Sequence, residues 1–403
     1  MNNGKKSGYL VLGYACNQRC RGCPLVHKDK RQTFIGTEAL FREIDGMYSF
    51  GVTDITLSGG EPTLHPSFFD VIQHCFNKGM AVHILSNGES FCREDFSEKL
   101  ITLSKQGELS VTTTFHSVIP EEHEYQNGSV GSFTRSMEGL IKLDANEVNV
   151  SVKHCITAYN YQQLPSFIEY VLVKYSANAE IQLWGIDLCG IDEENARKMF
   201  VSFSEIGKYL MKAIDLFEKD KSFGQRVLTV NNLPLCMCDC YYWRYFSSLA
   251  DDTYINHKEG GKKMEPETGP ISENCVACGF SRICMGAYYS NFSIMGDDIV
   301  GPPEMESPLS RVCSGYHIYC ADDLNKTYFT PYVTGSLILR GLELTNNLSG
   351  ESVIIRAHTQ QLLALLGMLR EGVQMDILQA WLQREGIDDG TLLMNMQKKG
   401  IIE

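Results

Sequence analysis

The sequence predicts an α/β fold built on a curved, open partial barrel. The first observation is a regular alternation of short apolar segments with amphipathic segments of helical length over residues 9–187. This alternation builds a parallel sheet, because each helical crossover returns the chain to the edge where the next strand is added. The second observation is that six such units are present, too few to close an eight-stranded barrel. We therefore expect an open (β/α)6 sheet.

The strands and helices of this predicted barrel follow one another closely. We expect strands at Tyr9–Gly13, Ile55–Ser58, Ala81–Ser86, Leu109–Phe115, Glu147–Ile156 and Glu180–Gly185. We expect helices at Thr37–Phe50, Ser67–Lys78, Arg93–Lys105, Ser132–Asp144 and Gln162–Tyr175, where apolar residues recur at helical spacing. One long amphipathic helix, Asn195–Lys219, would close this domain, to which we assign residues 1–225.

The composition excludes several classes of protein. The chain has 403 residues, of which 43% are hydrophobic, enough for more than one domain. A net charge of −13 argues against a broad surface for nucleic acid or anionic lipid. The sequence has no apolar segment long enough to span a membrane and no apolar signal segment. We expect a cytoplasmic protein that binds neither nucleic acid nor membrane.

Clustered cysteines indicate metal ligation, because disulfides are disfavoured in the cytosol. Cys16, Cys20 and Cys23 are spaced C-x3-C-x2-C on a loop that leaves the first strand. Three thiolates can hold three irons of a four-iron cluster and leave the fourth iron open. The alternatives are a zinc knuckle with His27 as fourth ligand, or free thiols. We favour the iron–sulfur cluster.

This loop, followed by Ser58-Gly59-Gly60-Glu61-Pro62 after the second strand, resembles the radical S-adenosylmethionine (SAM) enzymes. The resemblance implies a (β/α)6 TIM-type core and a [4Fe–4S] cluster on the three catalytic cysteines, with SAM chelating the open iron. It also implies an electron from a flavodoxin or ferredoxin-type donor, cleavage of SAM to a 5′-deoxyadenosyl radical, and hydrogen abstraction from the substrate. One departure is Gly22, because this family usually places an aromatic residue there, near the adenine.

Further candidates follow the strands at their carboxyl ends, where ligands gather in parallel α/β folds. By resemblance, Gly59, Gly60 and Glu61 would meet the methionyl amine of SAM; a tight turn with a solvated Glu is the alternative. After the third strand, Ser86 and Asn87 either hydrogen-bond a ribose or carboxylate, or serve only as turn residues.

The later strands offer candidates for the wall of the cavity. His116, after the fourth strand, either lines the substrate cavity or is an ordinary loop histidine. Lys153 and His154 are neighbours in the fifth strand, so only one of them points into the barrel. Gln182 and Trp184 share one face of the sixth strand. The sequence leaves open which face is the cavity side.

A second cysteine group, spaced C-x2-C-x5-C, lies in residues 226–330 and resembles the auxiliary-cluster extensions called SPASM and, in shorter form, Twitch. The resemblance implies one auxiliary [4Fe–4S] cluster, with Cys236 as our choice of fourth ligand. A second cluster and a structural zinc ribbon are the alternatives. The proposed ligands are Cys236, Cys275, Cys278 and Cys284, and the rivals of Cys236 are Cys238, Cys240, Cys313 and Cys320. We expect a strand around Arg226–Thr229, an exposed loop at His257–Pro270 and a linker over 301–330.

Residues 331–403 predict a small C-terminal α+β module. A hairpin is expected from Ser336–Leu344 and Ser352–Arg356, and helices at Thr359–Arg370, Met375–Arg384 and Gly390–Lys398. The pattern resembles a winged-helix-like module. Sparse Lys and Arg in the second helix and the acidic chain disfavour DNA. Peptide recognition and a lid that merely packs on the enzyme stay open.

This combination of parts resembles maturases of ribosomally made peptides, which form cross-linked, thioether or epimerised products. The resemblance implies a precursor peptide as substrate. One alternative is a radical SAM dehydrogenase or cofactor-biosynthesis enzyme acting on a small molecule. Another alternative, of a different class, is a non-catalytic metal-binding regulator.

Overall fold

The computed structural model describes most of the chain and divides it into two compact units. The described residues are 6–24, 32–220, 225–238, 240–247, 254–259, 262–263, 268–269, 272–276, 284–300, 326–327, 333–338, 341–346, 351–371, 373–387, 390–399 and 401–402. The first unit comprises Met1–Asn232, Asp252–Thr268 and Ala287–Gly296, and the second comprises Leu233–Asp251, Gly269–Gly286 and Asp297–Glu403. Among the described residues, no helix is long and apolar enough to cross a membrane.

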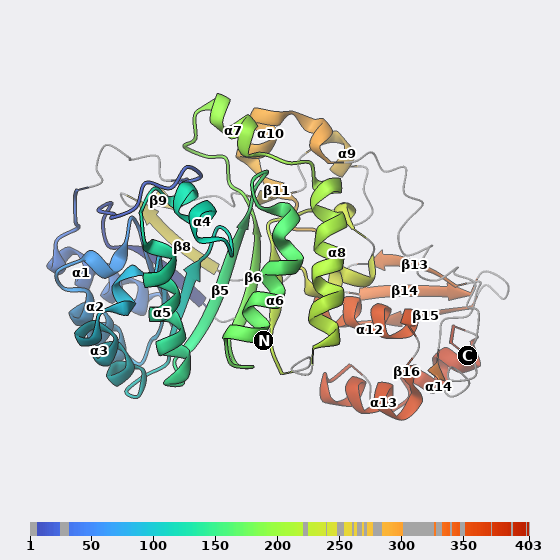
Figure 1. Ribbon diagram of the computed structural model, residues 1–403. Coiled ribbons are helices and arrows are strands. Elements are labelled where there is room, and N and C mark those ends of the chain that lie inside the picture. Colours follow the sequence, from blue (N-terminus) through green and yellow to red (C-terminus); the bar gives the residue numbers. More distant parts are fainter. Residues whose placement is uncertain are drawn as a thin grey trace. The chain divides into compact units, whose positions relative to one another are not determined.

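The first unit is built on one sheet whose seven main strands are parallel and adjacent in chain order (Figure 1). These strands are β1 (Lys6–Val11), β2 (Asp54–Ser58), β3 (Ala81–Ser86), β4 (Leu109–Thr114), β5 (Asn149–Ile156), β6 (Glu180–Gly185) and β7 (Leu228–Asn231). The sheet continues beyond β1 with the parallel strand β8 (Tyr254–Glu259) and the antiparallel strand β9 (Lys262–Lys263). Among the described strands, the order ends at β7 and β9 and does not close, so the predicted open partial barrel is confirmed.

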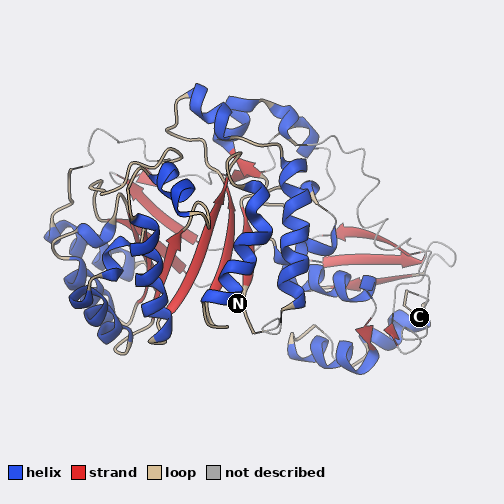
Figure 2. Ribbon diagram, in the orientation of Figure 1, coloured by secondary structure: helices blue, strands red, loops and turns tan. Residues whose placement is uncertain are grey.

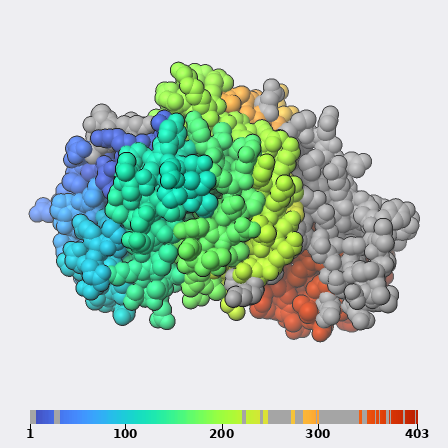
Figure 3. Space-filling model, in the orientation of Figure 1, coloured from blue at the N-terminus to red at the C-terminus, as the bar shows by residue number. Residues whose placement is uncertain are grey.

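Helices between these strands cover one face of the sheet (Figure 2). The space-filling view from the same side shows the surface of the chain coloured by residue number (Figure 3). The helices are α1 (Thr37–Ser49), α2 (Phe68–Phe76), α3 (Glu94–Ser104), α4 (Pro120–Asn127), α5 (Ser132–Ala145), α6 (Leu164–Lys174), α7 (Glu193–Met199) and α8 (Phe203–Lys219). Their buried apolar residues meet the buried strand residues, including Ile55, Ile84, Val111, Val152 and Leu183, to form the core. Burying this much apolar surface is the main force that stabilises the unit.

Two predictions in this unit are wrong. The expected single helix Asn195–Lys219 is two helices, because the Ser202 side chain accepts a hydrogen bond from the Glu205 backbone and caps a new helix at that point. The expected exposed loop His257–Pro270 begins with strand residues instead, since β8 pairs with β1 along Lys6–Tyr9. That pairing joins segments far apart in the chain, so local sequence gave no sign of it.

The second unit carries the C-terminal module as a three-stranded antiparallel sheet and three helices. The strands are β13 (Val333–Ile338), β14 (Gly341–Asn346) and β15 (Ser352–Ile355), and the helices are α12 (Thr359–Glu371), α13 (Met375–Arg384) and α14 (Leu392–Lys398). The three helices agree with the prediction. The predicted strand Ser336–Leu344 is wrong in extent, because it folds back at Gly341 into two paired strands.

Short elements complete the description. In the first unit they are the 3-10 turns Pro62–Leu64, Glu89–Cys92 and Tyr161–Gln163, with β11 (Ala287–Tyr288) and α10 (Tyr289–Met295). In the second unit they are the 3-10 turns Leu235–Met237, Cys240–Tyr245 and Asp297–Ile299, with α9 (Glu273–Val276), β12 (Lys326–Thr327) and β16 (Val373–Gln374). The remaining strand, β10 (Thr268–Gly269), pairs with β11. The predicted linker over 301–330 lies almost entirely outside the described residues.

Candidate functional site at the carboxyl ends of the strands

The two motifs that the sequence singled out lie against each other. The backbone N–H of Gly60 donates to the Gly13 carbonyl at 2.9 Å, and the N–H of Glu61 donates to the Ala15 carbonyl at 2.7 Å. A Cβ on Gly59 would lie 2.3 Å from the Gly13 oxygen, and one on Gly60 would lie 2.2 Å from the Ala15 oxygen. Only glycine permits this approach, so the glycines serve to join the second strand's loop to the start of the cysteine loop.

The Glu61 carboxylate is buried and fully engaged by its own chain. Its Oε1 accepts hydrogen bonds from the Thr63 backbone at 3.1 Å, the Thr63 hydroxyl at 2.6 Å and the Ser86 hydroxyl at 2.8 Å. Its Oε2 accepts from the Asn87 backbone at 2.7 Å. Burial raises the pKa of Glu61, while these four bonds act in the opposite direction. The side chains of Glu61 and Ser86 therefore shape the loop, and their contact with SAM stays a prediction.

The cysteine loop is held from two sides. The Asn87 side-chain amide donates to the Asn17 side-chain oxygen at 2.7 Å, which ties the loop after β3 to it. On the other side, the backbone N–H groups of Arg19 and Arg21 donate to the carbonyls of Asn127 and Gln126, each at 2.8 Å. These three hydrogen bonds hold the loop without involving the thiols.

The three thiols fit an iron–sulfur cluster by their chemistry and placement. Cys16, Cys20 and Cys23 are all half-buried and form no disulfide. The Gln18 backbone N–H already points at the Cys16 sulfur, at 3.4 Å, as a donor to a thiolate would. Within the described parts of the chain, no three His, Cys, Asp or Glu side chains yet converge closely enough to hold a metal ion. Cluster assembly would draw the sulfurs together, since metal binding and local folding are coupled.

The face of the sheet opposite the helices is largely polar, and we call it the inner face. It carries Tyr9, Thr56, His83, Ser110, Thr112, Ser151, Lys153, Cys155, Gln182 and Trp184 at alternate positions of β1–β6. A parallel sheet buried on both faces is normally apolar on both. The polar residues therefore favour the inner face as the side on which a ligand would bind.

The structure settles the orientation of two strands. The Lys153 ammonium lies 3.8 Å from the centre of the Trp184 ring, so both side chains belong to the inner face. His154 points the other way: its Nδ1 lies 2.8 Å from the Phe115 carbonyl and its ring packs on Phe167 of α6. Lys153 therefore lies on the inner face with Gln182 and Trp184.

Burial disfavours the charged forms of the titratable groups on this face. Burial lowers the pKa of Lys153, and burial together with the Lys153 charge lowers the pKa of His83 and of His116 to about 4. The His83 ring lies between the hydroxyls of Ser110 at 2.7 Å and Thr112 at 3.1 Å. His116 is half-buried, and its place in a substrate cavity stays a prediction.

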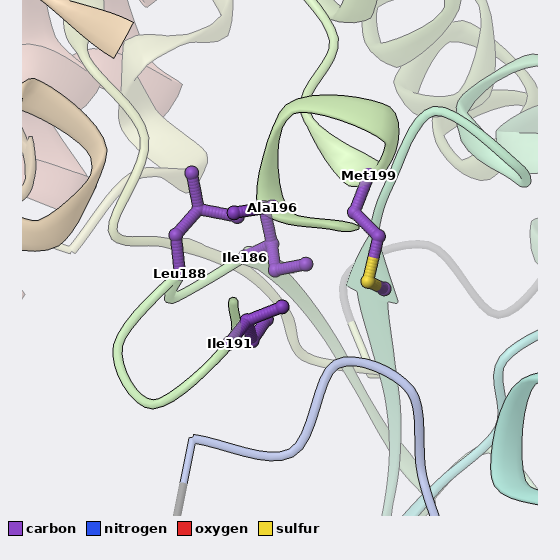
Figure 4. Close-up of a cluster of buried hydrophobic side chains, with 5 residues drawn as sticks. All are labelled: Ile186, Leu188, Ile191, Ala196 and Met199. Carbon is purple, nitrogen blue, oxygen red and sulfur yellow. The ribbon is translucent and has the colours of Figure 1, made fainter. Parts of the chain in front are cut away.

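The missing aromatic residue at Gly22 has a structural counterpart. A Cβ at Gly22 would lie 2.8 Å from Met199 Cε and 3.5 Å from Ile186 Cδ1. These two residues belong to a buried apolar cluster with Leu188, Ile191 and Ala196, gathered between α7 and the loop after β6 (Figure 4). The side chains of Met199 and Ile186, which lie far from Gly22 in the sequence, thus occupy the space beside it.

The second cysteine group is described in part. In the second unit, the Cys284 sulfur accepts hydrogen bonds from the backbone N–H groups of Leu235 and Gly286, both at 3.3 Å. Leu235 precedes Cys236, so the structure brings the segments of Cys236 and Cys284 together. Cys236 is exposed, while its rival Cys238 is buried. Cys278, Cys313, Cys320 and the side chain of Cys240 lie outside the described residues, so the ligand set stays a prediction.

A parallel α/β sheet with a three-cysteine loop after its first strand and a glycine motif docked against that loop defines a class of protein. Residues 10–171 match the family model of the radical SAM superfamily, and both the cysteine loop and the glycine motif lie within this match. The family implies a [4Fe–4S] cluster and SAM. As predicted, the chain resembles proteins named for the biosynthesis or maturation of peptide products.

Particular relatives are similar over part of their length. The tungsten-containing aldehyde ferredoxin oxidoreductase cofactor-modifying protein of Pyrococcus furiosus is 24% identical over 172 residues, 41% of this chain and 47% of that protein. The sporulation killing factor maturation protein SkfB of Bacillus subtilis is 26% identical over 219 residues, 54% of this chain and 50% of that protein. The chain thus spans about half the length of these relatives. Streptococcus suis SuiB bound to precursor peptide SuiA aligns with a TM-score of 0.49 and 12% identity over 75% of this chain and 74% of SuiB.

Sequence reasoning missed two residues near the cysteine loop, Glu89 and Arg135. Glu89 is buried and accepts hydrogen bonds from the loop residue Gln18 and from Arg135. Gln18 and Glu89 are 71 positions apart in the sequence, and Glu89 and Arg135 are 46 positions apart, so no local pattern joins them. The only signal was a charged residue directly after Ser86-Asn87-Gly88.

Proposed function

We propose that this protein is a radical SAM oxidoreductase that matures a ribosomally made precursor peptide by a cross-link, thioether or epimerisation. Cys16, Cys20 and Cys23 would hold the [4Fe–4S] cluster, with SAM at its open iron. When bound, cluster and SAM supply a 5′-deoxyadenosyl radical that abstracts hydrogen from the substrate. Gly59, Gly60, Glu61, Ser86, Asn87 and His116 stay the proposed residues around SAM and the cavity.

The docking of the glycine motif on the cysteine loop carries this proposal. Hydrogen bonds from Gly60 to Gly13 and from Glu61 to Ala15 fix both motifs in one place, at the carboxyl ends of adjacent parallel strands. A zinc knuckle has no need of such a partner, because a zinc site needs only its own four ligands. The polar inner face below this point supports a substrate that enters the sheet from the same end.

A peptide substrate is supported by the second unit. β15 pairs with β14 on one side, and no described strand pairs with its other edge. Along it, Val353 and Ile355 are buried while Ile354 is 49% exposed. An extended peptide can add to such an edge through main-chain hydrogen bonds. The small C-terminal module, residues 331–403, would then recognise part of the precursor peptide, and SkfB, a maturation protein, favours this kind of role.

The auxiliary cluster stays part of the proposal. Cys236, Cys275, Cys278 and Cys284 would form it in the domain of residues 226–330. Two backbone N–H groups aimed at the Cys284 sulfur support a thiolate there, since such donors stabilise a charged sulfur. A flavodoxin or ferredoxin-type protein would supply the electron.

The first experiment tests the core of the proposal. Protein purified without oxygen and reconstituted should contain iron and sulfide and release 5′-deoxyadenosine from SAM under reductant. Replacing Cys16, Cys20 and Cys23 with Ala should abolish this release. Cys189→Ala, an exposed cysteine outside both groups, is the matched control. Undiminished cleavage of SAM by the triple variant would end the radical SAM assignment of this loop.

A small-molecule substrate is the second candidate, because one relative is a cofactor-modifying protein. A short peptide encoded beside the gene separates the two. Co-incubation of that peptide, deuterated, with enzyme and SAM should move deuterium into 5′-deoxyadenosine and change the peptide's mass. No transfer, with active SAM cleavage, would favour the small molecule.

A further inference from the structure

We propose that the ion pair between the buried Glu89 carboxylate and Arg135 positions the cysteine loop and sets the reduction potential of the cluster held there. The proposal rests on the cluster assigned above to Cys16, Cys20 and Cys23. Both residues lie outside the cysteine and glycine motifs. They act through Gln18, which stands between the first two cysteines.

The link between the pair and the loop is direct. The Gln18 side-chain amide donates to Glu89 Oε1 at 2.8 Å, and the Gln18 oxygen lies 3.5 Å from the Cys20 sulfur. The Gln18 backbone N–H points at the Cys16 sulfur at 3.4 Å. One residue thus contacts both thiols and a buried carboxylate. Movement of that carboxylate would displace the part of the loop that spaces the two cysteines.

Glu89 is itself held in place by three further bonds. Arg135 donates to Glu89 Oε2 through Nε at 2.9 Å and through Nη2 at 2.5 Å. The Ser129 hydroxyl donates to Glu89 Oε1 at 3.0 Å. The Glu89 side chain is 8% exposed while Arg135 is 40% exposed, so the carboxylate is the buried partner. A two-bond arginine–carboxylate contact fixes direction as well as distance.

The charges of the pair also bear on the cluster electrostatically. Reduction adds an electron, so a nearby negative charge opposes it and a positive charge favours it. In the intact pair the two charges largely cancel. Removing Arg135 leaves the Glu89 carboxylate uncompensated beside the loop, where burial limits screening. Removing the Glu89 charge leaves the partly exposed Arg135 uncompensated. Loss of the Glu89 charge and loss of the Arg135 charge must therefore move the reduction potential in opposite directions.

The experiment measures the midpoint potential of the reconstituted cluster by redox titration with electron paramagnetic resonance detection. Glu89→Gln should raise the potential and Arg135→Met should lower it, each by about 59 mV, a tenfold change in a one-electron equilibrium constant. Arg135→Lys should restore it toward the wild-type value. Lys142→Met, which removes the same charge from an exposed pair with Glu94, is the matched control and should not shift it.

A second readout tests the link to Gln18. Gln18→Leu leaves both charges in place, so the potential should change little while iron loss to a chelator becomes faster, by about tenfold. Shifts of equal sign in Glu89→Gln and Arg135→Met, or no shift in either, would overturn the proposal. If Glu89→Gln fails to fold, the comparison of Arg135→Met with Arg135→Lys decides. A wild-type protein that assembles no cluster would instead refute the proposed function.

Discussion

The Glu61 carboxylate offers the sharpest test of the geometry of the site. In Glu61→Gln, one oxygen becomes an NH2 group. Both carboxylate oxygens accept bonds from fixed donors, with Thr63 and Ser86 on Oε1 and Asn87 on Oε2. Whichever oxygen the NH2 group replaces, it faces N–H or O–H donors of Thr63 and Ser86 or of Asn87, so two donors oppose each other. The variant keeps the shape of the side chain and changes only its hydrogen-bonding capacity.

The size of the effect follows from these bonds. An unsatisfied buried donor costs about 1–3 kcal/mol, and each remaining bond weakens because its acceptor loses its charge. Relief from burying a charge offsets part of this loss. We expect the free energy of unfolding to fall by about 2 kcal/mol and SAM affinity to fall with it, since the motif would no longer be held in place.

Urea denaturation of the reconstituted protein measures the stability change, and calorimetric titration measures SAM binding. Glu94→Gln, at an exposed carboxylate, is the control and should change stability by less than about 0.5 kcal/mol. If Glu61→Gln kept both the stability and the SAM affinity of wild type, the role of this carboxylate in the site would be wrong. Wild-type stability with SAM binding at least tenfold weaker would instead assign Glu61 to direct contact with SAM.

Four further predictions concern other parts of the chain. Burial lowers the pKa of His154 from 6.5 to about 4, so the contribution of its neutral form to stability is fully present above pH 6.5 and is lost as the pH falls toward 4. His154→Asn should therefore give a shallower dependence of the free energy of unfolding on pH. Lys153→Met should weaken binding of an anionic ligand in the cavity by about tenfold or more while unfolding in urea as wild type does; unchanged binding would remove Lys153 from the site. Replacing Cys275 and Cys278 with Ala should remove about half the iron, assuming two four-iron clusters, and leave uncoupled 5′-deoxyadenosine formation without product; zinc in their place would refute the auxiliary cluster. Ile354→Pro should abolish precursor-peptide binding measured by fluorescence anisotropy without reducing SAM cleavage, because proline blocks strand addition at that edge; undiminished peptide binding would exclude this edge.

Much of the fold could be predicted because its signals are local. The strands alternate with helices of regular length, and six of the expected strands are present within a few residues of their expected bounds. The break between α7 and α8 was also a local signal, since Ser202 and Glu205 have the spacing of a helix cap. The pairing of β8 with β1 had no local signal, because it depends on a contact between distant segments.

The site divides in the same way. The cysteine and glycine motifs are visible in the sequence because their members are adjacent, and strand order places them together. The side of β5 that faces the cavity could not be predicted, because alternation alone does not distinguish the two faces; the packing of His154 on Phe167 decides it. Glu89 and Arg135 were missed because their link to Gln18 exists only in the folded chain.

The central claim is that three cysteines hold a four-iron cluster with one iron open to SAM. Electron paramagnetic resonance of the reduced protein, with and without SAM, tests it most directly. The variant lacking Cys275 and Cys278 isolates the signal of the cluster on Cys16, Cys20 and Cys23. The account predicts a [4Fe–4S] signal whose g values change when SAM is added. An unchanged signal, or a site that contains zinc after purification without oxygen, would contradict it.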